Sequence, residues 1–116
     1  MSRSVPLLLE DVLERIGRIE RAIAGMEQES FKRDEKTIDS VVRNLEVIGE
    51  AASRLPEEFR EQHAVVPWRR IVGLRHRIVH AYFDVDLDLV WTIVLQELPE
   101  LKMRLSAIRA ENAGEA

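Results

Sequence analysis

The sequence predicts an all-α protein, an antiparallel bundle of four to five helices. Apolar residues recur at steps of three and four over long stretches, whereas no stretch alternates convincingly at the two-residue period of a strand. Prolines at positions 6, 56 and 67 fall where these stretches begin or end. The chain of 116 residues suits one domain spanning 1–116, with its core expected over about residues 7–108.

Composition narrows the function classes. Hydrophobic residues make up 46% and charged residues 33%, which favours a folded, soluble domain. The absence of cysteine excludes disulfides and thiolate metal sites, and it fits a cytoplasmic protein. No apolar run approaches the roughly 20 residues that a membrane-spanning helix needs. The net charge of −4 means that any contact with nucleic acid must be local.

The first helix is expected over residues 6–26. Pro6 suits a first helical turn, and Gly25 with the polar stretch "EQES" is expected to end the helix. One apolar stripe runs along it, formed by Leu9, Val12, Leu13, Ile16, Ile19, Ile23 and Met26.

The second helix is expected over residues 34–55, with Asp34 as its N-cap and Pro56 as its stop. The seam for a partner helix is formed by Ile38, Val41, Leu45, Ile48, Ala52 and Leu55. Gly49 costs about 1 kcal/mol inside a helix, so we expect another helix to approach closely there. A buried Asn44 or Glu50 would need a partner, which an arginine of the third helix could supply. The stretch "EEFREQH" is expected to form a short helical turn.

The third helix is expected over residues 67–82, with an apolar line formed by Ile71, Leu74, Ile78 and Tyr82. The fourth begins near Asp84 or Asp86, either of which could cap it. Its apolar stripe is formed by Leu87, Val90, Val94, Leu98, Leu101, Leu105 and Ile108. Pro99 lies inside this stripe and should kink or break the helix.

The stretch "RHRIVHAYF", residues 75–83, concentrates cationic and titratable side chains in an acidic chain. Residues 69–80 contain no acid, and their cationic or titratable members are Arg69, Arg70, Arg75, His76, Arg77 and His80. Arginine offers a planar fork of donors that matches phosphate oxygens. Histidine can move protons near neutral pH. Together they could cleave an RNA phosphodiester without a metal.

On one continuous helix these groups would not share a face. Arg75 and His80 would point about 140° apart, whereas His76 and His80 would lie on the same face. A helix that ends near His80, or a site completed by a second subunit, would bring Arg75 and His80 together.

Three simpler interpretations compete with a catalytic one. The arginines could form a solvated helix face. His76 and His80 could be metal ligands at helical spacing, although only Asp84 or Asp86 could supply a third. Tyr82 could belong to the core, with its hydroxyl at the edge.

The residues "RHRIVHAYF" resemble the R-x4-H-x-Y motif of HepT toxins, which belong to the HEPN ribonucleases. Here the motif is Arg75, His80 and Tyr82. The flanking blocks "DEKTIDSVVRNLEVIGEAA", "PWRRIVGLRHRIVHAYFDVDLDLVW" and "LPELKMRL" follow in the same order, so the resemblance covers about residues 7–108.

The resemblance implies a homodimeric HEPN bundle with its cleft where the motif helices of two protomers meet. His80 would then exchange protons with the 2′-hydroxyl or the leaving oxygen, and Arg75 would stabilise the scissile phosphate. His76 stands where asparagine is commoner, and it could orient Arg75 or share proton transfer, with Arg77 as a second supporting residue. Neither a metal nor a cofactor is implied. The implied partner is an MntA-like nucleotidyltransferase antitoxin that attaches AMP to Tyr82.

The sequence therefore supports two candidate functions. The first is a metal-independent endoribonuclease toxin that acts on cellular RNA, tRNA or mRNA, and leaves a 2′,3′-cyclic phosphate. The second is a non-catalytic HEPN module that binds a nucleotidyltransferase or a nucleotide through the surface around Arg75.

Overall fold

The protein is a bundle of helices built on three long ones. The computed structural model describes residues 3–114, with the backbone alone at positions 83, 113 and 114. The long helices are α1 (Val5–Ile23), α3 (Glu35–Ser53) and α8 (Leu98–Gly114). The shorter elements are α2 (Gln28–Arg33), α4 (Glu57–Gln62), α5 (Trp68–Val72), α6 (Leu74–Ile78), the 3-10 turn η1 (Ala81–Phe83), α7 (Leu87–Thr92) and the π-helical turn η2 (Ile93–Glu97). Within the described residues no strand forms beyond one isolated bridge, which confirms the all-α prediction.

Short-range capping signals begin the main helices where the sequence indicates. Ser4 caps α1 by accepting the Leu7 N–H at 3.4 Å. Asp34 caps α3 as expected, because its Oδ1 accepts the Thr37 N–H at 3.1 Å. Of the two candidates for the fourth helix, Asp86 is the cap.

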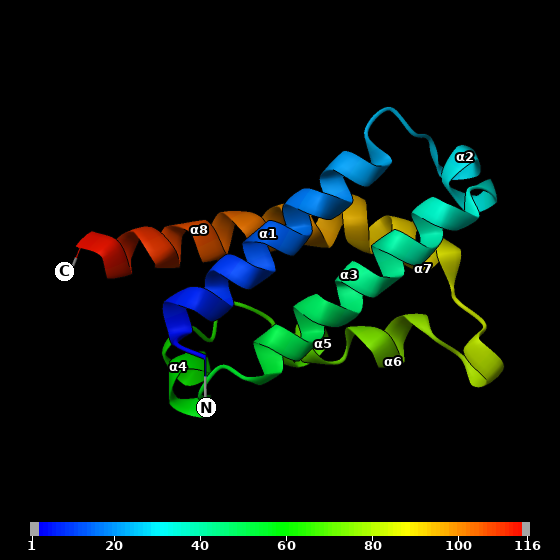
Figure 1. Cartoon of the computed structure of the whole chain (residues 1–116). Helices are drawn as coiled ribbons and strands as arrows, with labels where there is room; N and C mark the ends of the chain where they lie inside the picture. The colour runs from blue at the N-terminus through cyan, green and yellow to red at the C-terminus, as the bar shows by residue number, and fades with distance from the viewer. Residues whose placement is uncertain (1–2, 115–116) are drawn as a thin grey trace.

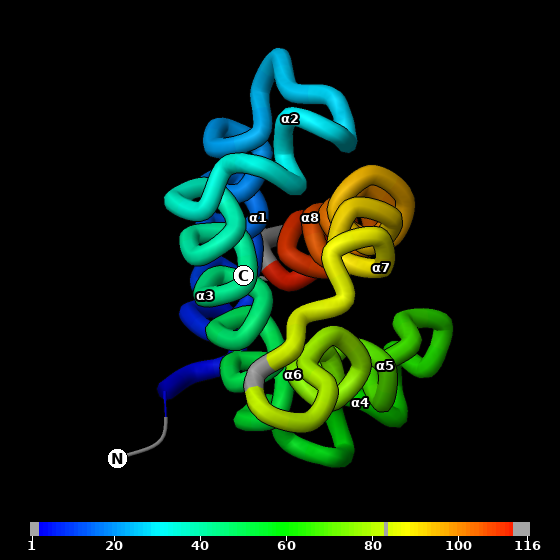
Figure 2. Tube along the Cα trace, turned by 90° about the vertical axis from the view of Figure 1, so that its right-hand side faces the viewer, coloured from blue at the N-terminus to red at the C-terminus, as the bar shows by residue number. Residues whose placement is uncertain are grey.

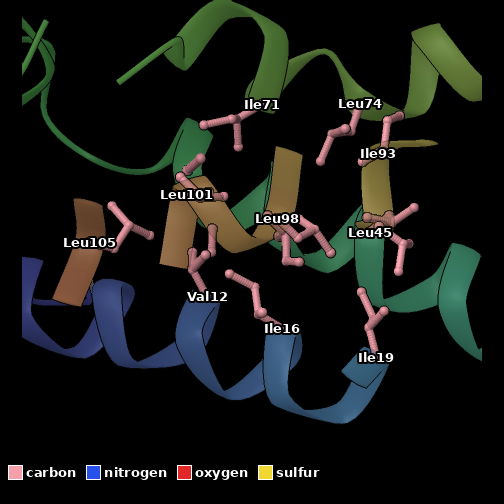
Figure 3. Packing of buried hydrophobic residues seen from close by; sticks show 14 of the residues in the cluster. Val12, Ile16, Ile19, Leu45, Ile71, Leu74, Ile93, Leu98, Leu101 and Leu105 are labelled. Carbon is pink, nitrogen blue, oxygen red and sulfur yellow. The ribbon is translucent and has the colours of Figure 1, made fainter. Parts of the chain in front are cut away.

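The core lies between α1, α3, α8 and the α5–α6 segment. α1 and α3 run antiparallel beside each other, and α8 crosses against α1 (Figure 1). Figure 3 shows side chains from all of these elements meeting in one cluster. The labelled members are Val12, Ile16, Ile19, Leu45, Ile71, Leu74, Ile93, Leu98, Leu101 and Leu105. Aliphatic contacts of this kind are the main source of stability in a bundle.

Gly49 marks the point where α5 lies directly on α3. A Cβ atom at position 49 would sit 3.0 Å from the carbonyl oxygen of Ile71 and 3.3 Å from that of Val72. The expected close approach of another helix is therefore confirmed, and it fixes α5 and α6 against α3.

Asn44 is buried, but its partner differs from the expected one. The side-chain oxygen accepts a hydrogen bond from Arg15 of α1 at 3.2 Å, and its amide donates to the Ser40 carbonyl at 2.8 Å. The arginine therefore comes from α1 rather than from the third helix, because α1 packs along this face of α3. Glu50 pairs with Arg54 on its own helix.

The first helix ends at Gly25 and the polar stretch, as expected, although its last residue is Ile23 rather than Met26. Gly25 does follow the end of α1, with φ of +78°. The residues after it then form α2, whose Phe31 is fully buried against Trp91 with ring centroids 5.1 Å apart. A single aromatic anchor thus stabilises a short helix that has no periodic pattern to reveal it.

The third helix is shorter than expected and is broken at Gly73, which ends α5 and begins α6. The prediction of one helix over 67–82 is therefore wrong. The fourth helix is not broken at Pro99: α7, η2 and α8 follow without a gap. The Leu98 N–H bonds to the Ile93 carbonyl in a wider π-helical turn, which accommodates the missing proline N–H just beyond it.

The segment that carries the basic residues lies at the edge of the bundle. Figure 2 shows α5 and α6 below the α7–α8 helix, with the chain crossing from α6 to α7 beside one end of α3. Over the residues that the structure covers, none of the helices combines the length and apolarity needed to traverse a bilayer.

Candidate functional site

The backbone between α6 and α7 closes into a tight loop that takes His80 off the helix. α6 ends at Ile78, whose carbonyl accepts the Asp86 N–H at 2.8 Å. The His80 N–H donates to the Asp84 carbonyl at 2.7 Å, and Val79 forms an antiparallel bridge with Val85. These bonds replace the ones that a longer helix would make, so the two arms of the loop lie side by side.

His80 therefore has a different neighbourhood from the one that helical spacing predicts. Its Nε2 lies 3.6 Å from Oδ2 of Asp86, and the side chain is 57% exposed. The expected common face of His76 and His80 is not formed, because His80 has extended backbone with φ of −94° and ψ of −172°. The separation of about 140° calculated for Arg75 and His80 on one helix does not apply either. The helix does end near His80, which was one of the two arrangements expected to change the relative directions of Arg75 and His80.

Arg75 and His76 stay on α6 and face α3. Both are exposed, and both line a groove with Val72 and a row of α3 residues, Glu46, Gly49, Glu50 and Ser53. Among the side chains that the structure describes, no carboxylate lies within 4.0 Å of the Arg75 guanidinium. Its donors are therefore accessible to an incoming anion, although the groove itself also carries two acids.

Arg77 points to the other side of α6, toward the π-helical turn. Its two terminal nitrogens donate to the two carboxylate oxygens of Glu97 at 2.8 and 2.7 Å. Arg70 reaches the same carboxylate at 3.3 Å. The hydrogen bonds from Arg77 lower the pKa of Glu97 and raise that of Arg77 itself. Two of the basic residues are thus paired with an acid, so the stretch is not one uninterrupted positive stripe.

Tyr82 sits at the tip of the loop and not in the core. The residue is 99% exposed, and its backbone adopts φ of 60° and ψ of 36°. It is the one non-glycine residue in the described part of the chain with a positive φ. The interpretation of Tyr82 as part of an apolar helix line is therefore wrong, because the helix ends four residues earlier. A side chain presented in this way is accessible to another macromolecule.

The suggested metal pair of His76 and His80 loses its geometric basis when His80 leaves the helix. Over the described residues, no three histidine or acidic side chains are arranged to hold a metal ion. Asp86 contacts His80, whereas Asp84 meets it through the backbone.

Comparison with known proteins decides the family. A family model described as "Ribonuclease HepT-like" matches residues 12–108, which is most of the chain and includes the whole loop. This chain belongs to the HepT-like ribonuclease family. The resemblance to this family that the sequence indicated is thereby confirmed.

Individual members of the HepT-like family are similar to this chain over most of both sequences. A protein assigned as an RNase in Caldanaerobacter subterraneus subsp. tengcongensis is 39% identical over 100 residues, covering 86% of this chain and 89% of its own. The probable ribonuclease HepT of Thermococcus cleftensis is 38% identical, covering 94% and 99%. The mRNA nuclease HepT of Shewanella oneidensis is 26% identical, covering 86% and 97%. No solved structure matches significantly.

Two acids beside the HepT-like motif escaped the sequence reasoning. Asp86 was considered only as a helix cap or a metal ligand, and its position facing His80 depends on how the loop closes. Glu97 lies 20 residues beyond Arg77 and meets it only because the π-helical turn packs against α6. The local sequence around Glu97 offers no signal for that contact.

Proposed function

We propose that this protein is a metal-independent endoribonuclease toxin whose catalytic residues are Arg75 and His80. The observation that carries the proposal is their placement: both side chains are exposed at the two ends of one short segment, in a chain of the HepT-like ribonuclease family. A buried or fully ion-paired Arg75 could not bind a phosphate. The substrate would be cellular RNA, tRNA or mRNA, which places the activity in the cytoplasm.

The chemistry requires one proton carrier and one fixed cation. His80 takes the proton from a ribose 2′-hydroxyl, and the 2′-oxygen forms a bond to the adjacent phosphorus. The bond to the 5′-oxygen breaks, and that oxygen takes a proton from solvent water, to which His80 later returns its own. The products are a 2′,3′-cyclic phosphate end and a 5′-hydroxyl end. Arg75 donates hydrogen bonds to the phosphate oxygens as their charge increases.

A second protomer would complete the site. Within one protomer Arg75 lines the groove against α3, whereas His80 faces Asp86, so the two side chains have different neighbours. Because α6 lies at the edge of the bundle, two copies can bring their α6 segments together (Figure 2). The Arg75 of one copy would then meet the His80 of the other, with His76 lining the same groove and Arg77 holding α6 to η2.

Tyr82 would be the point of control. We propose that an MntA-like nucleotidyltransferase antitoxin transfers AMP from ATP to the Tyr82 hydroxyl, which forms a phosphodiester bond and releases pyrophosphate. The exposed loop tip supports this proposal, since the Oη must enter another enzyme's active site. A bulky anion two residues from His80 would repel RNA phosphates from the site.

A non-catalytic binding module remains the second candidate. It is favoured by the net charge of −4 and by Glu46 and Glu50, which line the Arg75 groove and oppose RNA phosphates. In this case Arg75 would dock a nucleotide or a nucleotidyltransferase, and RNA would not be cleaved.

One assay separates the two candidates. Wild type, His80→Ala and His63→Ala are incubated with total RNA and with tRNA in excess EDTA. We expect cleavage by wild type and His63→Ala, with cyclic phosphate ends, and a loss of about 100-fold or more for His80→Ala, because removing a general acid–base group costs about that much. His63 is a suitable control because it contacts Phe59, 4.6 Å between ring centroids, and lies outside the loop.

Three other results would contradict parts of this proposal. Equal cleavage by wild type and His80→Ala would remove His80 from the chemistry. No cleavage by a wild-type preparation whose intact mass shows no AMP would favour the binding module. Activity that appears only after a metal is added would contradict the metal-independent reaction.

A further inference from the structure

We infer that Asp86 is a positioning residue for His80, a role that rests on the ribonuclease function proposed above. Its carboxylate faces Nε2 of the imidazole, which leaves Nδ1 as the nitrogen that exchanges protons with RNA. The observation is the separation of 3.6 Å between Nε2 of His80 and Oδ2 of Asp86 across the closed loop.

Asp86 is held more firmly than an ordinary surface acid. Its backbone N–H donates to the Ile78 carbonyl at 2.8 Å, at the end of α6. Its Oδ1 accepts the Leu89 N–H at 3.1 Å, in the first turn of α7. These two bonds fix both the backbone and the rotamer. The second carboxylate oxygen is then directed at His80 from a defined position.

The loop holds His80 in register with that oxygen. The His80 N–H donates to the Asp84 carbonyl at 2.7 Å, and the bridge between Val79 and Val85 pairs the two arms. The imidazole and the carboxylate therefore face each other from opposite arms of one closed turn. A change in either arm would move them relative to each other.

A separation of 3.6 Å is too long for a good hydrogen bond, but it is short enough for an ion pair once His80 carries a second proton. When His80 takes a proton from the 2′-hydroxyl, it becomes an imidazolium beside the carboxylate. Asp86 therefore favours the state reached during the reaction more than the ground state, which is the requirement for accelerating it.

Helix capping alone does not account for this arrangement. Asp34 caps α3 with the same geometry, its Oδ1 accepting the Thr37 N–H at 3.1 Å. Within the described part of the chain, no histidine side chain lies within 4.0 Å of the Asp34 carboxylate. The two aspartates thus share the capping role and differ in the imidazole, which makes Asp34 a matched control.

The test is the pair Asp86→Asn and Asp34→Asn. Asparagine keeps an oxygen for the cap and is about as good an N-cap as aspartate, but it carries no charge. Cleavage kinetics and thermal unfolding are measured for both variants and for wild type. A variant RNA with a 2′-deoxy sugar at the scissile position reports affinity without cleavage.

For Asp86→Asn we expect kcat to fall about two- to fivefold, the factor that corresponds to about 0.4–1 kcal/mol for an exposed ion pair. KM should stay unchanged or fall, and the affinity for the uncleavable RNA should stay unchanged or rise, because a negative charge is removed near the RNA phosphates. The melting temperature should change no more than it does for Asp34→Asn, which should retain wild-type kcat.

The results that would overturn the inference differ from those that would overturn the ribonuclease function. If wild type cleaves RNA and Asp86→Asn has the same kcat, Asp86 has no positioning role and the function stands. A parallel loss of kcat, RNA affinity and thermal stability would reduce Asp86 to a structural cap. If wild type does not cleave RNA at all, both the function and this role fail.

Discussion

At the scale of single residues, Tyr82 shows how one backbone conformation changes the meaning of a side chain. Spacing alone placed it on the apolar line of a helix, four residues after Ile78. In the structure α6 ends at Ile78, and Tyr82 has φ of 60° at an exposed loop tip. A non-glycine residue in this conformation is uncommon and often belongs to a functional site.

The first prediction concerns Tyr82, the single tyrosine of the chain. When the protein is produced together with its cognate nucleotidyltransferase, we expect an added mass of one or more AMP groups, mapped to the peptide that contains residue 82. Tyr82→Phe should gain no such mass, because phenylalanine lacks the accepting hydroxyl. It should keep its RNA cleavage when the nucleotidyltransferase is present, whereas wild type should lose nearly all of its own.

Phenylalanine has the same backbone preference as tyrosine, so the variant tests the hydroxyl and not the loop. Modification of Tyr82→Phe at any other residue would show that the loop tip is not the acceptor. Loss of cleavage in Tyr82→Phe without the nucleotidyltransferase would indicate that the tyrosine belongs to the catalytic chemistry instead.

At the scale of elements, α6 is held by two contacts that are far apart in the sequence. On one side the α5 backbone rests on Gly49 of α3, and on the other Arg77 pairs with Glu97 of η2. Both contacts fix the short segment that presents Arg75 and His80. A helix of five residues is too short to be stable alone, so tertiary contacts of this kind must determine its position.

The second prediction concerns the stability that the Arg77–Glu97 pair gives to the fold at acid pH. Because Arg77 lowers the pKa of Glu97 below its ordinary value of 4.5, the pair stabilises the fold above about pH 4.5. That contribution is lost as the pH falls further and Glu97 takes up a proton. When the pH is lowered from about 5 to about 3, the melting temperature of wild type should therefore fall by about 4 °C more than the melting temperature of Glu97→Gln.

Glu58→Gln, a change at an exposed glutamate on α4, is the matched control and should follow wild type across the same range. The measurement is thermal unfolding by circular dichroism at each pH. Parallel curves for wild type and Glu97→Gln would show that the pair contributes no pH-dependent stability.

The elements also divide into those that sequence reasoning could predict and those that it could not. The long helices follow from apolar spacing and from caps such as Asp34, which are local signals. The break at Gly73, the closed loop and the π-helical turn have no comparable signal in apolar spacing, and the loop closes through bonds longer than one helical turn, for example from Asp86 to Ile78. The motif positions Arg75, His80 and Tyr82 could be named from the sequence, but their orientation could not.

At the scale of the whole molecule, charge is distributed in a way that favours a site shared between two copies. The chain has a net charge of −4, and Arg70 and Arg77 are paired with Glu97. One protomer therefore offers little uninterrupted positive surface to RNA. Two protomers that bring their Arg75 side chains toward the partner's His80 would concentrate the accessible cations at one place.

The last prediction tests this shared site by mixing two inactive variants. If each site takes Arg75 from one protomer and His80 from its partner, a mixed dimer of Arg75→Ala and His80→Ala has one site with both changes and one intact site. Random exchange makes about half of the dimers mixed, so cleavage should recover to about a quarter of the wild-type level. Each variant alone should stay inactive, and a double variant Arg75→Ala/His80→Ala mixed with either single one should not recover. A site contained within one protomer gives no recovery in any mixture, because every protomer then lacks one of the two residues.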